Sequence, residues 1–296
     1  MKILITGGSG LLGQYLNLEL SKESDILTLY NNNIGNCTDF KSVKIDMTNF
    51  QLLEKAFENF LPDIVVHTAS ISNPQSAHKL NPKIVYDVNV NATIKIAELC
   101  EKYKAKLIYT STDLVYAGYR GSMLNEDAKL IPISIYAETK LMGEVKIQET
   151  FDNYLILRMA LMFGFGLNHS KNHFSQMYKN LKNKNKVKLF YDQFRTPVSL
   201  LEASRIINSF CKIDAKGEII NMGGKERISR VELGEILCNI GGLDKSLIEK
   251  ISMEEFKDSP MVADVSMNTE KLQSYGIRTK NVEESITEAV KNYEIT

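Results

Sequence analysis

Runs of apolar, β-branched residues alternate with amphipathic segments through the first half of the chain. An apolar run predicts a buried strand, and apolar positions three and four apart predict a helix that packs on it. The expected strands are residues 2–6, 25–30, 43–45, 63–67, 106–110 and 154–158, and the expected helices are 11–22, 49–60, 82–103 and 134–151. Strands that are apolar along their whole length are typical of sheets covered on both faces. The pattern therefore predicts an α/β fold built on a doubly wound parallel sheet.

The second half has a different pattern and begins with a polar, Asn- and Lys-rich loop. Helices are expected at 173–183, 199–211, 230–240 and 282–293, and strands at 187–190 and 218–222, with irregular chain before the last helix. We expect residues 1–160 to form the first domain, with 187–222 returning to it. Residues 161–186 and 223–296 are then expected to form a smaller C-terminal domain. It would cover the carboxyl edge of the sheet, where doubly wound folds bind ligands.

Charge and composition make several classes of function unlikely. Lys and Arg number 36 and so do Asp and Glu, and this balance gives no electrostatic footprint for nucleic acid. No apolar stretch is long enough for a membrane span. The four cysteines are scattered without metal-ligand spacing, which favours buried thiols in a reducing compartment. We therefore expect a cytoplasmic protein with neither a membrane nor a nucleic-acid partner.

Gly7, Gly10 and Gly13 follow the first expected strand at a spacing of three residues and lead into the first turn of the first expected helix, and Gly8, Gly10 and Gly13 also fit GxGxxG. Such glycines allow a tight turn, close approach of a pyrophosphate and close packing of helix on strand. The helix would then start at Leu11 and Leu12, whose backbone N–H groups would face the phosphates. The spacing and its place predict a nucleotide site of the Rossmann type.

The end of the second expected strand bears on which dinucleotide binds. A carboxylate there would bind the ribose 2′-OH of NAD, but the chain reads YNNN at residues 30–33. Asn31 does not repel a 2′-phosphate, which favours NADP(H), with NAD(H) also acceptable. Asp46 and Met47 follow the third strand and are expected near the adenine, although capping of the next helix explains Asp46 equally well.

The fourth expected strand ends in small residues where a dinucleotide would pass. Thr68, Ala69 and Ser70 are therefore expected to contact the cofactor. His67 precedes them within an apolar run, so we expect a packed histidine and not a catalytic one.

A candidate proton-transfer site lies beyond the fifth strand. Tyr136 and Lys140 are four residues apart in a helical segment and so project from one face. An unperturbed tyrosine titrates near pH ~10 and donates a proton more readily than it accepts one, and a neighbouring ammonium group lowers that value. Thr112, at the end of the fifth strand, can hydrogen-bond the same substrate oxygen.

Together these segments resemble a known family. The chain contains TGGSGLLG at residues 6–13, STDLVY at 111–116 and YAETKLMGE at 136–144. Further marks are HTA at 67–69, DVNVN at 87–91, DQ at 192–193 and DVSM at 264–267. These motifs, in this order and over nearly the whole chain, resemble the extended short-chain dehydrogenase/reductases, and within them the dTDP-4-dehydrorhamnose reductase group.

The resemblance implies roles for individual residues. Thr112, Tyr136 and Lys140 would be the catalytic triad, with Tyr136 and Lys140 also touching the cofactor. Asn89 would bind the cofactor through a water or fix its helix against the catalytic strand. The resemblance also implies a nucleotide-sugar substrate, a possible homodimer, and substrate contacts from three further residues, Asp113, Arg158 and Arg195.

A metal is not expected. Some members of the group use Mg²⁺, but no carboxylates here have the spacing of a Mg²⁺ site. His169 and His173 lie four apart, on either side of a polar loop that offers no third ligand.

Three reactions and one non-catalytic role share this scaffold. A 4,6-dehydratase of the family carries an Asp-Glu pair after the catalytic Thr, whereas Asp113 is followed here by Leu114, which cannot exchange protons. An epimerase needs only the triad and stays open. The regulatory β subunit of methionine adenosyltransferase looks like this group and acts through a partner, but the intact triad argues against that role. The sequence thus favours a reductase that reduces a 4-keto group on a nucleotide-activated deoxysugar.

Overall fold

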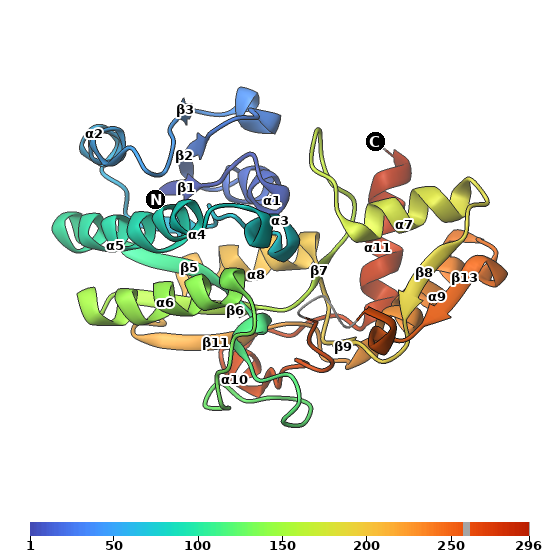
Figure 1. Ribbon diagram of the computed structural model, residues 1–296. Coiled ribbons are helices and arrows are strands. Elements are labelled where there is room, and N and C mark those ends of the chain that lie inside the picture. The colour runs from blue at the N-terminus through green and yellow to red at the C-terminus, as the bar shows by residue number, and fades with distance from the viewer. Residues whose placement is uncertain (257–260, 296) are drawn as a thin grey trace.

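The central feature is a seven-stranded sheet whose neighbouring strands all run parallel (Figure 1). The structure is a computed structural model that describes residues 1–256 and 261–295. The strands stand in the order β11-β6-β5-β4-β1-β2-β3. Their bounds are β1 Lys2–Thr6, β2 Asp25–Tyr30, β3 Ser42–Lys44, β4 Ile64–His67, β5 Lys106–Thr112, β6 Tyr154–Met159 and β11 Glu218–Met222. Strand order reverses between β1 and β4, and the predicted doubly wound fold is confirmed.

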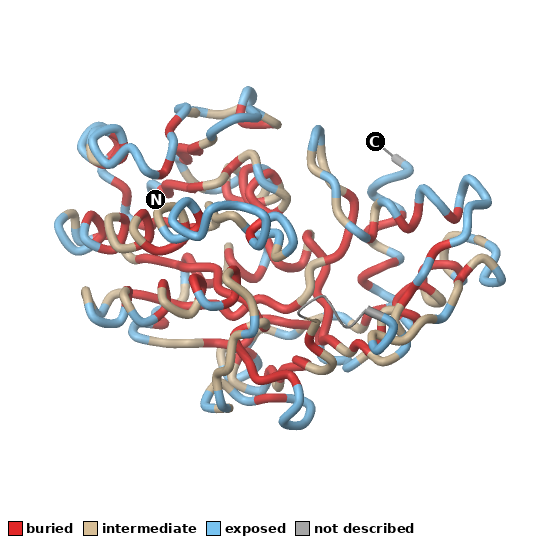
Figure 2. The backbone as a smooth tube through the Cα atoms, in the orientation of Figure 1, coloured by how far each residue is buried: buried red, intermediate tan, exposed pale blue. Residues whose placement is uncertain are grey.

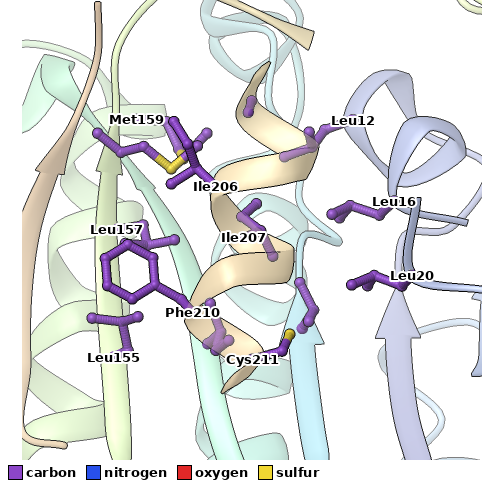
Figure 3. Close-up of a cluster of buried hydrophobic side chains, with 14 of the residues drawn as sticks. Leu12, Leu16, Leu20, Leu155, Leu157, Met159, Ile206, Ile207, Phe210 and Cys211 are labelled. Atoms are coloured by element: carbon purple, nitrogen blue, oxygen red, sulfur yellow. The ribbon is translucent and has the colours of Figure 1, made fainter. Parts of the chain in front are cut away.

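Helices cover both faces of this sheet. One face carries α1 (Leu11–Leu20) and α8 (Leu200–Lys212), and the other carries α2 (Phe50–Phe60), α5 (Ala92–Tyr103) and α6 (Ile135–Thr150). In Figure 3, Ile207 and Phe210 of α8 lie between the leucines of α1 and those of β6. Because both faces are covered, most of the sheet lies in the buried interior of this lobe, whereas the edge strand β3 is largely exposed (Figure 2).

The segment expected as one long helix at 82–103 is divided in three. A short helix α4 (Pro82–Tyr86) leads into a π-helical turn (Asp87–Asn91) before α5 begins. A further helix, α3 (Pro74–Lys79), was not predicted. π-Turns interrupt helices mostly at functional sites, and this one brings Asn89 toward α6, as described below.

The smaller lobe lies beside the carboxyl edge of the sheet (Figure 1). Its helices are α7 (His173–Lys182), α9 (Arg230–Gly241) and α11 (Val282–Ile295), and side chains from all three share one apolar core. Strands β8 (Val187–Phe190) and β13 (Ile248–Ile251) pair with each other. Short pairs join β7 (Met162–Phe163) to β10 (Val198–Ser199) and β9 (Phe194–Arg195) to β12 (Ile228–Ser229), and α10 (Glu270–Ser274) packs near β11.

The pairing of β8 corrects one expected boundary. Residues 187–222 were expected to return to the first domain, but β8 joins β13 of the smaller lobe. The part that returns is α8 with β11, since α8 packs on α1 and β11 extends the central sheet. An apolar strand signals burial but not its partner, so the sequence pattern did not distinguish the two sheets.

A loop of the smaller lobe is tied to α1 by two side chains of that helix, Gln14 and Tyr15. Gln14 donates to the Leu167 carbonyl at 3.0 Å and to Ser170 Oγ at 2.7 Å, and its own oxygen accepts from Asn168 at 2.7 Å. Tyr15 donates to the Phe165 carbonyl at 2.7 Å. These bonds hold the second lobe against the helix that follows the glycine loop.

Two expectations about the whole chain can be compared with the structure. All four cysteines are buried with free thiols, as predicted. Within the described ranges, no helix is long and apolar enough to cross a bilayer.

Candidate active site

The glycine loop between β1 and α1 has the shape that its sequence predicts. Gly7 adopts φ +70°, and a Cβ there would stand 2.8 Å from the backbone of Ala69. A Cβ on Gly13 would come within 2.1 Å of the Gly7 carbonyl oxygen. Any side chain would therefore push the loop open. The turn is compact enough for a pyrophosphate to approach its backbone.

The start of α1 is left free of capping side chains. Gly10 is the N-cap and supplies no side-chain hydrogen bond, so the first helical N–H groups, at Leu11 and Leu12, are available to an anion. The Leu12 side chain points into the core and is 5% exposed. A contact from Leu12 to a cofactor would therefore come from its backbone.

The adenosine end differs from the sequence-based picture in one respect. β3 pairs with β2, and this places Asp46 beside Asn31, with Asn31 Nδ2 donating to Asp46 Oδ2 at 3.4 Å. Asp46 also accepts from the backbone and hydroxyl of Thr48, and these bonds lower the pKa of its carboxyl. A carboxylate thus does lie near the end of the second strand, supplied by its neighbour. Met47 is 6% exposed in the core, so its side chain lies away from the surface on which an adenine would bind.

The end of β4 lies against the glycine loop. Thr68 Oγ1 donates to the Thr6 carbonyl at 2.7 Å, and the Ala69 N–H donates to Thr6 Oγ1 at 3.2 Å. Thr68, Ala69 and Ser70 are each partly exposed, as cofactor contacts require. His67 is fully buried between Thr6 and Thr93, and burial lowers the pKa of its imidazole to about 3. It is the packed, neutral histidine that the sequence predicts.

The three candidate catalytic residues converge where β5 meets α6. Thr112 is the last residue of β5, and its side chain lies near enough to Tyr136 to act on the pKa of the Tyr136 hydroxyl. Tyr136 and Lys140 project from one face of α6, whose N-cap Ser134 accepts from the Ala137 N–H at 3.2 Å. Both are buried, at 9% and 2% exposure. The structure therefore brings the predicted trio together.

Burial shifts the pKa values of both proton-carrying groups. It raises the pKa of Tyr136 to about 12, with the Thr112 side chain opposing the rise. It lowers the pKa of Lys140 to about 7, with the negative charge of Glu144 opposing the fall. Lys140 Nζ stands 3.9 Å from the centroid of the Tyr109 ring. Strongly shifted groups that meet in this way are typical of catalytic sites.

Asn89 is used by the protein itself. Its Oδ1 accepts from the Ile71 N–H at 2.8 Å, and its Nδ2 donates to the Ile71 carbonyl at 3.3 Å and to Thr139 Oγ1 at 3.0 Å. The side chain is 1% exposed. The resemblance implied that Asn89 either binds the cofactor or fixes its helix. The observed bonds fix the π-helical turn to α6 and to the loop after β4, which is close to the second of these roles. The contact with the cofactor through a water stays a prediction.

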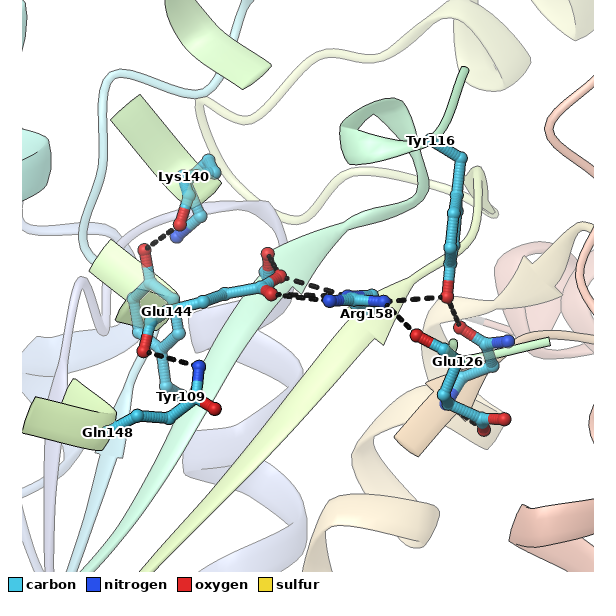
Figure 4. A network of polar contacts seen from close by, with 9 residues as sticks. Tyr109, Tyr116, Glu126, Lys140, Glu144, Gln148 and Arg158 are labelled. Carbon is cyan, nitrogen blue, oxygen red and sulfur yellow. Dashed lines mark hydrogen bonds and ion pairs between the residues drawn. The ribbon is translucent and has the colours of Figure 1, made fainter. Parts of the chain in front are cut away.

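Arg158 is a correction. It was expected to contact substrate, but it is 2% exposed and its guanidinium is occupied by protein groups (Figure 4). Its Nη2 pairs with Glu144 at 2.8 Å, and its Nη1 donates to Tyr116 Oη at 2.9 Å and to the Glu126 carbonyl at 2.8 Å. Arg158 stands in register with Ser111, the residue before Thr112, and is buried behind the candidate site.

A second charged group borders the trio. Asp113 follows Thr112 and is 4% exposed; its Oδ2 stands 3.6 Å from Arg195 Nε and finds no hydrogen-bond partner among the described residues. Burial raises the pKa of Asp113 and the two arginines Arg195 and Arg230 oppose the rise. Arg195 also donates to backbone carbonyls of Phe194 and Val262, which hold it in place.

Sequence reasoning missed Arg230. It is the first residue of α9, inside the Ser229–Glu232 capping box, and its Nε donates to Gln193 Oε1 at 2.8 Å. Burial and the nearby Arg195 lower its pKa to about 9. Asp264 also acts on Arg195 but is paired with Arg227 at 2.7 Å, so among the described residues Asp113 alone faces the two guanidinium groups and positive charge is in excess beside the trio. The sequence signal at this position, Ser229 followed three residues later by Glu232, is typical of a helix start and not of a site.

No residues in the described ranges form a group of three His, Cys, Asp or Glu side chains suited to a metal. His173 lies at the start of α7, where burial and Arg230 lower its pKa. His169 lies in the preceding loop, close to Gly35 of the other lobe.

Comparison with known proteins decides the family. A model of the RmlD substrate binding domain matches residues 1–295. The chain belongs to the RmlD family. This match confirms the predicted resemblance to the extended short-chain dehydrogenase/reductases. It also confirms the predicted enzyme class of that family, the NAD(P)-dependent oxidoreductases.

Relatives of this RmlD-family chain carry several functions. A dTDP-D-glucose 4,6-dehydratase of Dictyostelium discoideum is 30% identical over 81% of this chain and 62% of its own length, so the chain spans less than two thirds of that relative. A dTDP-4-dehydrorhamnose reductase of Aggregatibacter actinomycetemcomitans is 24% identical over 75% of this chain and 71% of its own. Methionine adenosyltransferase 2 subunit beta of Xenopus laevis is 24% identical over 93% and 83%.

A solved structure supports the same fold. The dTDP-4-dehydrorhamnose reductase of Bacillus anthracis, in complex with NADP, superposes with a TM-score of 0.86 at 22% identity, covering 98% of this chain and 99% of that one.

Proposed function

We propose that this protein is a nicotinamide-dependent reductase of a 4-keto group on a nucleotide-activated deoxysugar. The observation that carries the proposal is the meeting of Thr112, Tyr136 and Lys140 at the carboxyl edge of the sheet, on the side to which the glycine loop also opens. The relatives that reduce dTDP-4-dehydrorhamnose support the substrate class.

The residues divide the reaction among them. A nicotinamide cofactor, when bound, would supply the hydride for the carbonyl carbon. Tyr136 holds a proton at its phenolic oxygen and gives it to the carbonyl oxygen as negative charge develops there. Thr112 orients that oxygen by a hydrogen bond. Lys140, as an ammonium group, holds the nicotinamide ribose hydroxyls and stabilises the Tyr136 oxygen after the proton has left.

The charged groups beside the trio are placed for the rest of the substrate. Arg195 and Arg230 outnumber Asp113, so this region favours an anion such as the diphosphate of a nucleotide sugar. Asp113 Oδ2 faces Arg195 at 3.6 Å but makes no hydrogen bond among the described residues, and it is available to accept one from a sugar hydroxyl.

The cofactor proposal is NADP(H), with NAD(H) also accepted. Asn31 does not repel a 2′-phosphate, which was the basis for favouring NADP(H). Asp46 stands beside Asn31 and opposes a phosphate there, so we expect the preference to be small. As in the wider family, we propose a homodimer, which light scattering of the purified protein tests.

Two alternatives keep specific support. The β subunit of methionine adenosyltransferase is a relative over most of its length, which favours a non-catalytic cofactor-binding subunit. An epimerase would use the same trio. Leu114 at the position after Asp113 argues against dehydration, even though a dehydratase is among the relatives.

The test is oxidation of NADPH and of NADH, followed by nicotinamide absorbance, with a panel of 4-keto sugar nucleotides that includes dTDP-6-deoxy-4-keto sugars. We expect oxidation that Tyr136→Phe reduces by about 10²–10⁴-fold, with cofactor affinity nearly unchanged. Activity that survives Tyr136→Phe would refute the proton-donor role. Tight cofactor binding without oxidation across the panel would favour the subunit, and a changed sugar without net oxidation would favour the epimerase.

A further inference from the structure

One face of α6 carries a third buried polar residue that the proposed reaction does not use. Tyr136, Lys140 and Glu144 lie at successive turns of the helix and are 9%, 2% and 1% exposed. A glutamate this deeply buried requires partners, because an unpaired charge in the interior is very costly. Its partners show what it does.

The Glu144 carboxylate is held in one orientation from the sheet side. Arg158 Nε stands 3.2 Å from each of its oxygens, and Arg158 Nη2 stands 2.8 Å from Oε2. Ser111, next to the candidate catalytic Thr112, donates to Oε1. Arg158 is itself fixed from behind by Tyr116 and the Glu126 carbonyl.

The ion pair has a direction. In Figure 4, the carboxylate of Glu144 lies between Lys140 and Tyr109 on one side and the Arg158 guanidinium on the other. The negative end of the pair therefore faces Lys140 and the positive end faces away. A fixed dipole in a buried region acts more strongly on its neighbours than the same charges in water.

The other titratable groups that face Lys140 carry no charge near neutral pH. His67 of β4 stays neutral, because burial lowers its pKa to about 3. Tyr109 of β5 stays protonated, because burial raises its pKa well above 10. Tyr136 is raised in the same way. Among the described residues, Glu144 is the carboxylate that acts on Lys140, and it opposes the effect of burial there.

We propose that Glu144 is a positioning residue for Lys140: its carboxylate, fixed by Arg158 and Ser111, keeps the Lys140 side chain in the ammonium form that binds cofactor. The proposal rests on the role of Lys140 in the proposed function. It explains why a charged pair, and not apolar packing, lies behind the candidate site.

The experiment is the dissociation constant of NADH against pH, measured by nicotinamide fluorescence on the whole chain. NADH is the probe because it lacks the 2′-phosphate, a group that titrates near pH ~6. In the unaltered protein, we expect affinity to decline as pH rises through the pKa of Lys140. We call the pH at which affinity begins to decline the break. In Glu144→Gln, the break should move to lower pH by at least about one unit, because the ammonium form of Lys140 has lost its counter-charge.

Matched variants separate this effect from damage to the fold. Tyr116→Phe removes a hydrogen bond to Arg158 but no charge, and its break should stay in place. Should Glu144→Gln fail to fold, the double change Glu144→Gln with Arg158→Gln leaves no unpaired charge and should show a smaller shift in the same direction, because the Arg158 positive charge is removed as well. An unmoved break in the Glu144 variants, or an equal shift in Tyr116→Phe, overturns the proposal. A break that persists in Lys140→Met shows that Lys140 is not the titrating group, which overturns its role in the proposed function as well.

Discussion

Asn89→Ala distinguishes a structural clamp from a cofactor ligand. The change removes three hydrogen bonds, two to Ile71 and one to Thr139 Oγ1, at 2.8–3.3 Å. Thr139 Oγ1 keeps its bonds to the carbonyls of Ile135 and Tyr136, so losing the bond from Asn89 costs little stability. The Ile71 N–H is left without its acceptor, which costs about 1–3 kcal/mol, and the remaining bonds add about 1 kcal/mol. We expect the free energy of unfolding to fall by about 2–4 kcal/mol.

The assay is urea unfolding followed by circular dichroism, together with the dissociation constant of NADH. Asn91→Ala is the matched control: it lies on the same π-turn and makes one bond, to Asp87 at 2.8 Å, so its loss should stay below about 1 kcal/mol. A clamp predicts a large difference in stability between the two variants and a small one in NADH affinity of the folded protein. If Asn89→Ala were as stable as Asn91→Ala but bound NADH far more weakly, Asn89 would be a cofactor ligand and the clamp would be refuted.

Three further changes test other parts of the site. Gly13→Ala places a Cβ within 2.1 Å of the Gly7 carbonyl, so equilibrium dialysis should show loss of NADH and NADPH binding; unchanged affinity would contradict the assigned loop geometry. Asn31→Asp adds a second carboxylate beside Asp46 and should shift the ratio of kcat/KM toward NADH, whereas an unchanged ratio would mean that the 2′-position lies elsewhere. Lys140→Met tests the effect of Lys140 on stability. The pKa of Lys140 is lowered from its ordinary value of 10.5 in the unfolded chain to about 7 in the folded protein, so the unfolded chain binds more protons between pH 7 and pH 10.5. The free energy of unfolding of the wild type therefore rises with pH across that window. The free energy of unfolding of the variant should therefore exceed that of the wild type below pH 7, and the difference should shrink toward pH 10. If urea unfolding showed the same difference at every pH, the shifted pKa of Lys140 would be contradicted.

The amino-acid pattern by itself determined the features that depend on near neighbours. Apolar runs predicted the strands of the central sheet, because a strand buried on both faces needs apolar side chains throughout. Gly7, Gly10 and Gly13 predicted the phosphate turn, since backbone conformation and crowding there exclude side chains. The four-residue spacing of Tyr136 and Lys140 predicted a shared face, because helix geometry is local.

Tertiary structure decided what depends on the pairing of distant segments. Asp46 reaches Asn31 only because β3 lies beside β2. The apolar pattern of β8 did not indicate whether it joins the central sheet or the smaller lobe, and the structure pairs it with β13 of the smaller lobe. Arg230 joins the site from α9, and its neighbours Asp113 and Arg195 come from elements far away in the chain. Periodicity reports which side of an element is buried but not which element covers it, and charges interact through space, so these partners emerge only when the chain is folded.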